Sequence, residues 1–177
     1  MEKPLFEKKH YNTAGHAHEL TFSCYRRRRY FENEKSCEIF IAELEKAKKK
    51  HDFLIWAYVI MPNHVHVLIW PLNPVYDISR ILQDFKSKTA IKCSKLLKNI
   101  WQKKESEDFK FWQAGGGFDR NLWNALAIHS AIKYIEGNPV RGGLAAKQEL
   151  WQWSSAYARK NNTGLIPDVY KIPVLMK

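Results

Sequence analysis

Cysteine is scarce in this chain, and its placement argues against the usual tasks of clustered thiols. The three cysteines, Cys24, Cys37 and Cys93, lie far apart, and none belongs to a Cys-x-x-Cys pair. This spacing disfavours a zinc knuckle or a dithiol redox motif and predicts reduced thiols packed as small apolar side chains. With 177 residues, 45% of them hydrophobic, the chain is long enough to bury a core without disulfides.

Long apolar runs and acidic residues are scarce as well. No stretch approaches the roughly 20 apolar residues that span a bilayer, and the residues from Met1 to Pro4 show no signal-peptide core. We therefore expect a cytoplasmic, nucleoid-associated protein with no membrane partner. Eighteen Asp and Glu stand against 29 Lys and Arg, a formal net charge of +11. This surplus attracts polyanions, and nucleic acid is the leading partner.

The hydrophobic pattern indicates one domain at residues 19–158, between an N-terminal arm at 1–18 and a C-terminal tail at 159–177. Alternating residues predict strands at 19–25, 53–60 and 64–70. Met61-Pro62-Asn63 separates the last two strands, which we expect to pair as an antiparallel hairpin.

Helical spacing and the order of elements complete the predicted fold. Apolar residues recur with helical period at 34–51, 78–97 and 124–138. A further strand is expected to start at Phe111–Gln113. The order of elements predicts an α+β fold, an antiparallel β-sheet with helices packed on one face, as in the split βαβ (ferredoxin- or RRM-like) architecture.

Two histidines in the second strand of the hairpin are candidate metal ligands. His64 and His66 are two residues apart and project from the same face of a strand, so their imidazoles can hold one divalent ion. The alternative is a pair of polar residues on an exposed sheet face, and for an isolated His-x-His this alternative is the stronger. His16 and His18 have the same spacing but lie in the polar arm, where no strand fixes their geometry, so we rank them lower.

Tyr134 and Asn138 add a second candidate element. Four residues apart, they share one face of the predicted helix, where Tyr134 offers a nucleophile and Asn138 an oxygen ligand. Each alone is equally explained as a surface tyrosine and a helix-ending asparagine. The combination with the histidine pair favours a catalytic site.

Cationic side chains are the candidate contacts for phosphate, which add affinity without sequence information. The four consecutive arginines stand at a strand end, whereas scattered lysines are equally explained as a solvated surface. The predicted DNA contacts are Arg26, Arg27, Arg28, Arg29, Lys86, Lys88, Arg120 and Arg141.

Two segments resemble a known family. The segment Tyr58–Ile69, with its His-hydrophobic-His core, resembles the corresponding motif of the single-tyrosine (HUH) transposases. The segment Tyr134–Leu144 resembles the tyrosine helix of their REP-associated branch. Two shorter segments, Phe111–Gln113 and Trp153–Ser155, also resemble that branch. The resemblance covers about residues 19–158.

The resemblance implies a metal-dependent nuclease and strand transferase that cuts and rejoins single-stranded DNA at repeat hairpins. Tyr134 would be the nucleophile and form a 5′-phosphotyrosine, while His64, His66 and Asn138 would hold Mg²⁺ or Mn²⁺. The relatives include monomers and homodimers, and the sequence leaves both open. A non-cleaving, domesticated DNA- or RNA-binding protein on the same fold is the alternative. A metal phosphodiesterase using activated water is disfavoured, since the sequence offers no obvious carboxylate cluster near the histidines.

Overall fold

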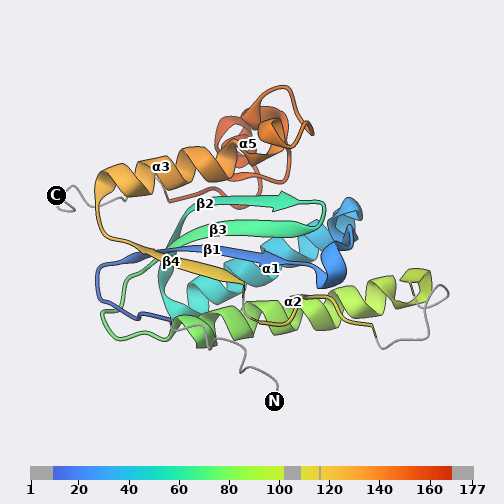
Figure 1. Cartoon of the computed structure of the whole chain (residues 1–177), viewed down its shortest axis with the longest axis horizontal. Coiled ribbons are helices and arrows are strands. Elements are labelled where there is room, and N and C mark those ends of the chain that lie inside the picture. The colour runs from blue at the N-terminus through green and yellow to red at the C-terminus, as the bar shows by residue number, and fades with distance from the viewer. Residues whose placement is uncertain (1–9, 102–108, 116, 169–177) are drawn as a thin grey trace, which may run out of the picture.

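Four antiparallel strands form one sheet in the order β2-β3-β1-β4 (Figure 1). The structure, a computed structural model, describes residues 10–101, 109–115 and 117–168. The strands are β1 (Ala17–Ser23), β2 (Phe53–Met61), β3 (His64–Pro71) and β4 (Phe118–Leu122). β2 and β3 form the predicted hairpin with Pro62 and Asn63 at its turn, and β1 pairs with β3 on one side and β4 on the other.

Helices and short 3-10 turns connect the strands. The α-helices are α1 (Glu34–His51), α2 (Ile78–Trp101), α3 (Ala125–Glu136), α4 (Asn138–Arg141) and α5 (Ser155–Asn161). The 3-10 turns are η1 (Tyr25–Arg27), η2 (Tyr30–Glu32) and η4 (Gln148–Leu150). Two asparagines fix helix starts, because Asn33 accepts a hydrogen bond from the Lys35 amide at α1 and Asn124 accepts one from the Ala127 amide at α3.

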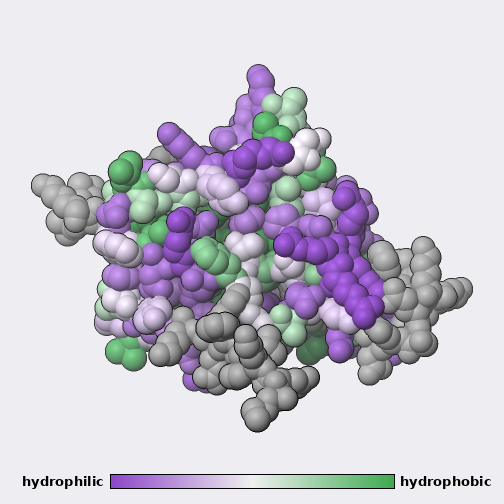
Figure 2. Space-filling view, in the orientation of Figure 1, coloured by the Kyte–Doolittle hydropathy of each residue, from purple (hydrophilic) through white to green (hydrophobic). Residues whose placement is uncertain are grey.

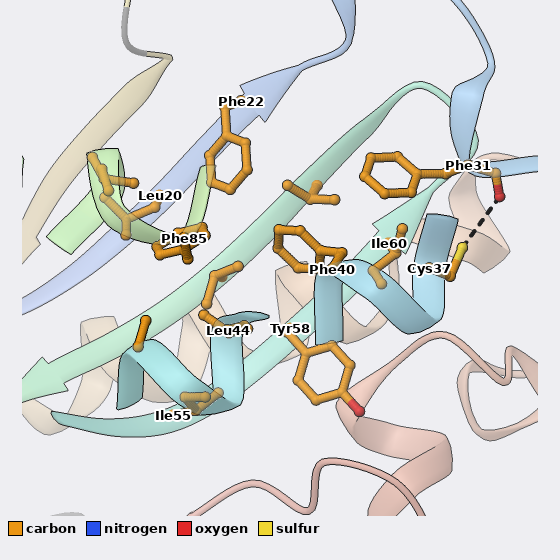
Figure 3. Close-up of a cluster of buried hydrophobic side chains, with 14 of the residues drawn as sticks. Leu20, Phe22, Phe31, Cys37, Phe40, Leu44, Ile55, Tyr58, Ile60 and Phe85 are labelled. Carbon is orange, nitrogen blue, oxygen red and sulfur yellow. Dashed lines mark hydrogen bonds between the residues drawn. The ribbon is translucent and has the colours of Figure 1, made fainter. Parts of the chain in front are cut away.

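One face of the sheet packs against α1 and α2. Leu20 and Phe22 project from alternate positions of β1 and join Phe40 and Leu44 of α1 and Phe85 of α2 in one buried cluster (Figure 3). The ring centroid of Phe22 lies 6.1 Å from that of Phe40 and 5.8 Å from that of Phe85. This layer is the larger part of the core.

The opposite face of the sheet packs against α3. Val59 of β2 and Leu68 of β3 form a second buried cluster with Ile128 and Ile135 of α3. The predicted α+β class and antiparallel sheet are confirmed, but the expectation that the helices lie on one face is corrected (Figure 1). The physical reason is β2, which is buried at every position and so needs cover on both faces.

Three predicted boundaries also change. β1 starts at Ala17, so the residues just before 19 belong to the sheet and not to the arm. Around Phe111–Gln113 there is only an isolated bridge between Trp112 and Cys24, and the fourth strand lies further on, at Phe118–Leu122. α3 ends at Glu136, and the next helix begins at Asn138, with Pro139 in its first turn, where proline is tolerated.

The three cysteines are free and buried, as predicted. Burial raises the pKa of the Cys24 and Cys93 thiols to about 12, so both stay protonated and unreactive at neutral pH. The Cys37 thiol donates a hydrogen bond to the Phe31 carbonyl oxygen, drawn as a dashed line in Figure 3. These side chains therefore belong to the core.

Hydrophilic side chains predominate on the molecular face shown in Figure 2, with smaller hydrophobic areas between them. Within the described residues, none of the helices combines the length and apolar character needed to cross a membrane.

The outer edge of β2 is covered, because the Ile60 amide donates to the Trp153 carbonyl oxygen and Val59 forms a bridge with Ser154. The strand at the other edge of the sheet is β4.

Candidate active site

His64 and His66 lie together on the side of β3 that faces α3. Strand alternation directs Val65 and Val67 into the cluster beneath α1 and α2 and leaves the two imidazoles on the opposite face. Their ring centroids are 5.0 Å apart. His66 is 6% exposed and His64 is partly buried, so the predicted pair is brought together as a local site.

Each imidazole is oriented by a hydrogen bond at Nδ1. Nδ1 of His66 is 2.8 Å from Oγ1 of Thr21, its register partner on β1, and Nδ1 of His64 is 2.7 Å from Oδ1 of Asn63. A hydrogen bond at one ring nitrogen fixes the ring and leaves the other nitrogen as the ligand atom. The Nε2 atoms of both histidines are therefore the candidate ligand atoms.

Both histidines are held in the uncharged form. Burial, followed by the nearby His64 and Arg141, lowers the pKa of His66 to about 3. Burial and the charge of Arg27 lower the pKa of His64 as well. Uncharged imidazole is the form that binds metal, so the pair is ready for a cation at neutral pH.

Tyr134 projects from α3 onto the same site. Its side chain is 49% exposed, and its ring centroid lies 5.8 Å from that of His66 at an interplanar angle of 88°. The guanidinium carbon of Arg141 lies 4.4 Å from the centre of the Tyr134 ring. The exposed phenol thus has both an imidazole and a cation as neighbours.

The turn after α3 holds Arg141 in this position. Arg141 Nη2 donates to the main-chain carbonyl oxygen of Tyr134. At Gly137 a Cβ atom would lie 2.8 Å from Arg141 Nη1 and 2.9 Å from the Lys133 carbonyl oxygen, too close for any side chain. Glycine at this position therefore allows the Arg141 side chain to lie over the Tyr134 ring.

Asn138 is the first residue of α4, after the end of α3, and its side chain contacts the last turn of α3. Its Nδ2 donates to the carbonyl oxygens of Tyr134 at 2.9 Å and Ile135 at 3.4 Å. These hydrogen bonds satisfy carbonyl groups that the helix end leaves without amide partners. Both use the amide nitrogen, so the oxygen Oδ1 is the atom of Asn138 that is left for a ligand.

This donor set fits a divalent cation. Two uncharged imidazoles and an amide oxygen are all established metal ligands, and three protein ligands leave positions open for phosphate oxygens. Among the described residues, no group of three or more His, Cys, Asp or Glu side chains is placed to hold a metal. A third protein ligand for the two histidines would therefore be of another type, such as the Asn138 amide.

A cavity of about 450 Å³ opens beside the histidine and the tyrosine. It is lined by Glu19, Thr21, His66, Phe118, Arg120 and Tyr134. Arg120 of β4 pairs with Glu19 of β1, its direct register partner. The sequence prediction missed Thr21 and Glu19, because only the register between β1, β3 and β4 shows that they face His66.

Comparisons with known proteins identify the family and the fold. Residues 12–138 match the family model described as Transposase IS200 like. The chain belongs to this family. It is 30% identical over 123 residues to the REP-associated tyrosine transposase of Escherichia coli, a match that covers 69% of this chain and 65% of that protein's length. A solved structure of a REP-associated tyrosine transposase bound to a REP hairpin has the same fold, with a TM-score of 0.73, 19% identity and 93% of both chains covered.

Four of the arginines that we predicted to contact DNA in this IS200-like transposase, Arg26 to Arg29, lie in or just after η1, beyond the end of β1. Arg26 and Arg27 have positive φ angles of 50° and 56°, a strained backbone that is found most often at functional positions. Arg27 is close enough to influence His64, as its effect on the pKa of that histidine shows. Arg28 packs over the ring of Tyr25, and Arg29 pairs with Glu32. Contact of these side chains with DNA stays a prediction.

The two lysines predicted to contact DNA lie on the other side of the sheet from Tyr134. The Lys86 ammonium lies 4.8 Å from the ring centre of Phe22, which belongs to the cluster beneath α1 and α2. Lys88 pairs with Asp84 at 2.7 Å. Phosphate contacts by these lysines would therefore involve DNA on the opposite side of the sheet from Tyr134.

The structure corrects the expectation that no strand fixes the geometry of His18. This histidine is fully buried in β1, with Nδ1 2.8 Å from Asp119 Oδ1 and Nε2 2.7 Å from the Tyr76 hydroxyl oxygen. His10 contacts the other oxygen of Asp119 at 2.6 Å. The strand and these partners fix the geometry that the sequence left undefined. His16 lies outside this cluster, with its ring centroid 5.6 Å from that of Trp123.

Proposed function

We propose that this transposase cuts and rejoins single-stranded DNA at hairpins of a repeated palindromic sequence through a 5′-phosphotyrosine intermediate, with help from Mg²⁺ or Mn²⁺. The observation that carries the proposal is the packing of the exposed Tyr134 ring against His66, with His64 and His66 uncharged on the same face. The solved relative is bound to a REP hairpin, which supports a DNA hairpin as the substrate.

The chemistry follows from the residues at the site. A divalent ion held by His64, His66 and Asn138 would polarise the scissile phosphate and stabilise its developing charge. Tyr134 Oη attacks phosphorus, the bond from phosphorus to the 3′ oxygen breaks, and that oxygen leaves as a 3′-hydroxyl with the proton that the phenol loses. The guanidinium of Arg141, 4.4 Å from the centre of the Tyr134 ring, would place a positive charge beside the attacking phenol.

Rejoining requires no nucleotide cofactor. The tyrosine–phosphate bond replaces one phosphodiester bond of the DNA, so it conserves the energy needed for the reverse reaction. A 3′-hydroxyl of a different strand then attacks phosphorus and displaces Tyr134. Strand transfer is therefore the reversal of cleavage with a new acceptor.

Trapping of the covalent adduct tests this proposal. Labelled single-stranded hairpins are incubated with protein and Mn²⁺ or Mg²⁺, and denaturing gels are inspected for a protein–DNA adduct. Wild type should form it, whereas Tyr134→Phe should bind the hairpin with similar affinity and form none. A Tyr134→Phe adduct equal to that of wild type would refute the assignment of the nucleophile.

The same experiment separates the two classes of function. A wild-type protein that binds the hairpins tightly but cleaves none of them, with either metal, would support the non-cleaving DNA- or RNA-binding alternative. The variant His64→Ala should lose the adduct and keep hairpin binding. This result would separate the role of the histidine in metal binding from a role in DNA affinity.

A further inference from the structure

The cavity beside His66 and Tyr134 contains a feature that phosphate binding does not explain. Glu19 is a carboxylate, only 4% exposed, on the same face of the sheet as the proposed catalytic residues of a strongly basic protein. A carboxylate repels phosphate, so Glu19 is unsuited to a DNA backbone contact. A carboxylate accepts hydrogen bonds, so a ligand that binds beside Glu19 should carry N–H donors.

The contacts of Glu19 leave one oxygen for such a ligand. Arg120 Nε and Nη2 lie 3.0 Å and 2.5 Å from the same carboxylate oxygen, Oε2. Within the described part of the chain, Oε1 has no hydrogen-bond partner. The arginine thus holds the carboxylate in place, and Oε1 remains available as an acceptor.

Phe118 supplies an apolar wall to the same cavity. It is 51% exposed although it is a large aromatic residue, and it stands opposite Thr21 in the β1–β4 register. An exposed aromatic ring beside a polar acceptor is the combination with which proteins stack and read unpaired bases. The cavity volume of about 450 Å³ falls within the usual range of small-molecule sites, roughly 300–1,000 Å³.

We infer that this cavity is a nucleobase pocket, in which Glu19 selects an amino-bearing base and rejects thymine at a position adjoining the scissile phosphate. Adenine, cytosine and guanine each carry an exocyclic amino group that can donate to Oε1. Thymine has none, and its single N–H is flanked by two carbonyl oxygens that would face the carboxylate. The inference rests on the proposed function, because it places the scissile phosphate at Tyr134.

The pocket lies where the base of such a nucleotide would be. His66 and Tyr134 belong both to the catalytic arrangement and to the cavity wall, whereas Glu19, Phe118 and Arg120 extend the wall along β1 and β4. A nucleotide whose phosphate contacts Tyr134 would then have space for its base beside these three side chains. The competing interpretation is that Glu19 and Arg120 form a cross-strand ion pair with a structural role alone.

Sequencing of cleavage products distinguishes the two interpretations. Hairpins with randomised single-stranded flanks are incubated with protein and Mn²⁺, and the strands in the covalent adduct and the released strands are sequenced separately. Wild type should deplete thymine at one of the two positions that flank the cut. The loss of one hydrogen bond to a charged group predicts roughly tenfold depletion.

Three variants make the test specific. Glu19→Gln keeps the size of the side chain and its bond to Arg120 but adds an N–H₂ donor, so thymine depletion should disappear. Glu45→Gln changes the net charge equally on α1, where Glu45 pairs with Lys49 on the surface, and should keep the depletion. Phe118→Leu should lower adduct yield for all bases, roughly fivefold or more, and keep the depletion.

Each contrary outcome is informative. Equal frequencies of the four bases at both flanking positions, with abundant wild-type adduct, would overturn the nucleobase pocket and leave the proposed function standing. Persistence of thymine depletion in Glu19→Gln would also overturn it, in favour of the structural ion pair. Absence of any wild-type adduct would refute the proposed function and the pocket assignment together.

Discussion

Removal of the Arg159 side chain should destabilise the protein strongly, because it leaves a buried carboxylate without its cation. Glu136 ends α3 and is 3% exposed. Its Oε1 accepts from Ser155 Oγ at 2.7 Å and Arg159 Nη1 at 2.9 Å, and its Oε2 accepts from Arg159 Nη2 at 2.8 Å. In Arg159→Ala, Oε2 loses this partner while the carboxyl group stays buried.

The expected cost is large for a single substitution. Breaking a buried ion pair by removing one partner costs about 3–5 kcal/mol, which is a large fraction of the stability of a typical domain. With a urea m-value of about 1–3 kcal/mol/M, the unfolding midpoint should fall by at least about 1 M. Urea titrations followed by far-UV circular dichroism at neutral pH measure this shift.

Two control variants show whether the loss of stability comes from the unpaired buried carboxylate. Lys35→Ala removes an exposed ion pair with Glu38 on α1 and should change stability by less than about 1 kcal/mol. The double variant Glu136→Leu/Arg159→Met replaces the pair by apolar side chains and should recover much of the loss. A loss of less than about 1 kcal/mol in Arg159→Ala would show that Glu136 is solvated, and the reasoning would be refuted.

Three further predictions concern the site and its support. Thr21→Val removes the hydrogen bond that orients His66 and should raise the Mn²⁺ concentration needed for half-maximal adduct formation roughly 10–100-fold, whereas Thr21→Ser should restore it. The pKa of Asp119 is raised by burial but lowered more strongly by hydrogen bonds from two histidines, so its net pKa lies below the ordinary value. A carboxyl with a lowered pKa stabilises the fold at neutral pH and loses this contribution as the pH falls, so wild type should lose more unfolding free energy than Asp119→Asn below about pH 5. Gly117→Ala would place a Cβ 2.1 Å from the Thr21 carbonyl oxygen at a φ of +82°, whereas Gly115→Ala meets only the backbone strain at a φ of +95°. Thermal unfolding should therefore show a clearly lower midpoint for the first alanine variant than for the second, and equal midpoints would contradict the close approach.

The parts of the fold that were predicted correctly carry strong local signals. α1 matches the predicted residues 34–51, since its apolar stripe is regular and Asn33 caps its start. The hairpin of β2 and β3 follows from two apolar runs around a proline-containing turn. In contrast, β4 has the sequence Phe-Asp-Arg-Asn-Leu, with little hydrophobic alternation. Its strand conformation depends on pairing with β1, a long-range contact that periodicity does not show.

The candidate site was predictable to the same extent. The histidine pair follows from strand alternation. Its meeting with Tyr134 was expected from the family resemblance, because it depends on α3 covering the second face of the sheet, which the hydrophobic pattern did not predict. Glu19 and Thr21 were not predicted, because their nearness to His66 depends on strand register. His18 was placed in a polar arm because its partner Asp119 is 101 residues away, and only the fold shows that a buried histidine there is satisfied.

The attachment of α3 has a consequence for the fate of the cut DNA. Buried contacts of Ile128, Ala131 and Ile135 with the sheet, and the ion pair at Glu136, hold this helix along its length. Under the proposed mechanism, the broken strand is tethered to a part of the protein with little freedom to travel. The 3′-hydroxyl of the acceptor strand would then have to reach the face of the sheet that α3 covers, since exchange requires its contact with the phosphorus on Tyr134.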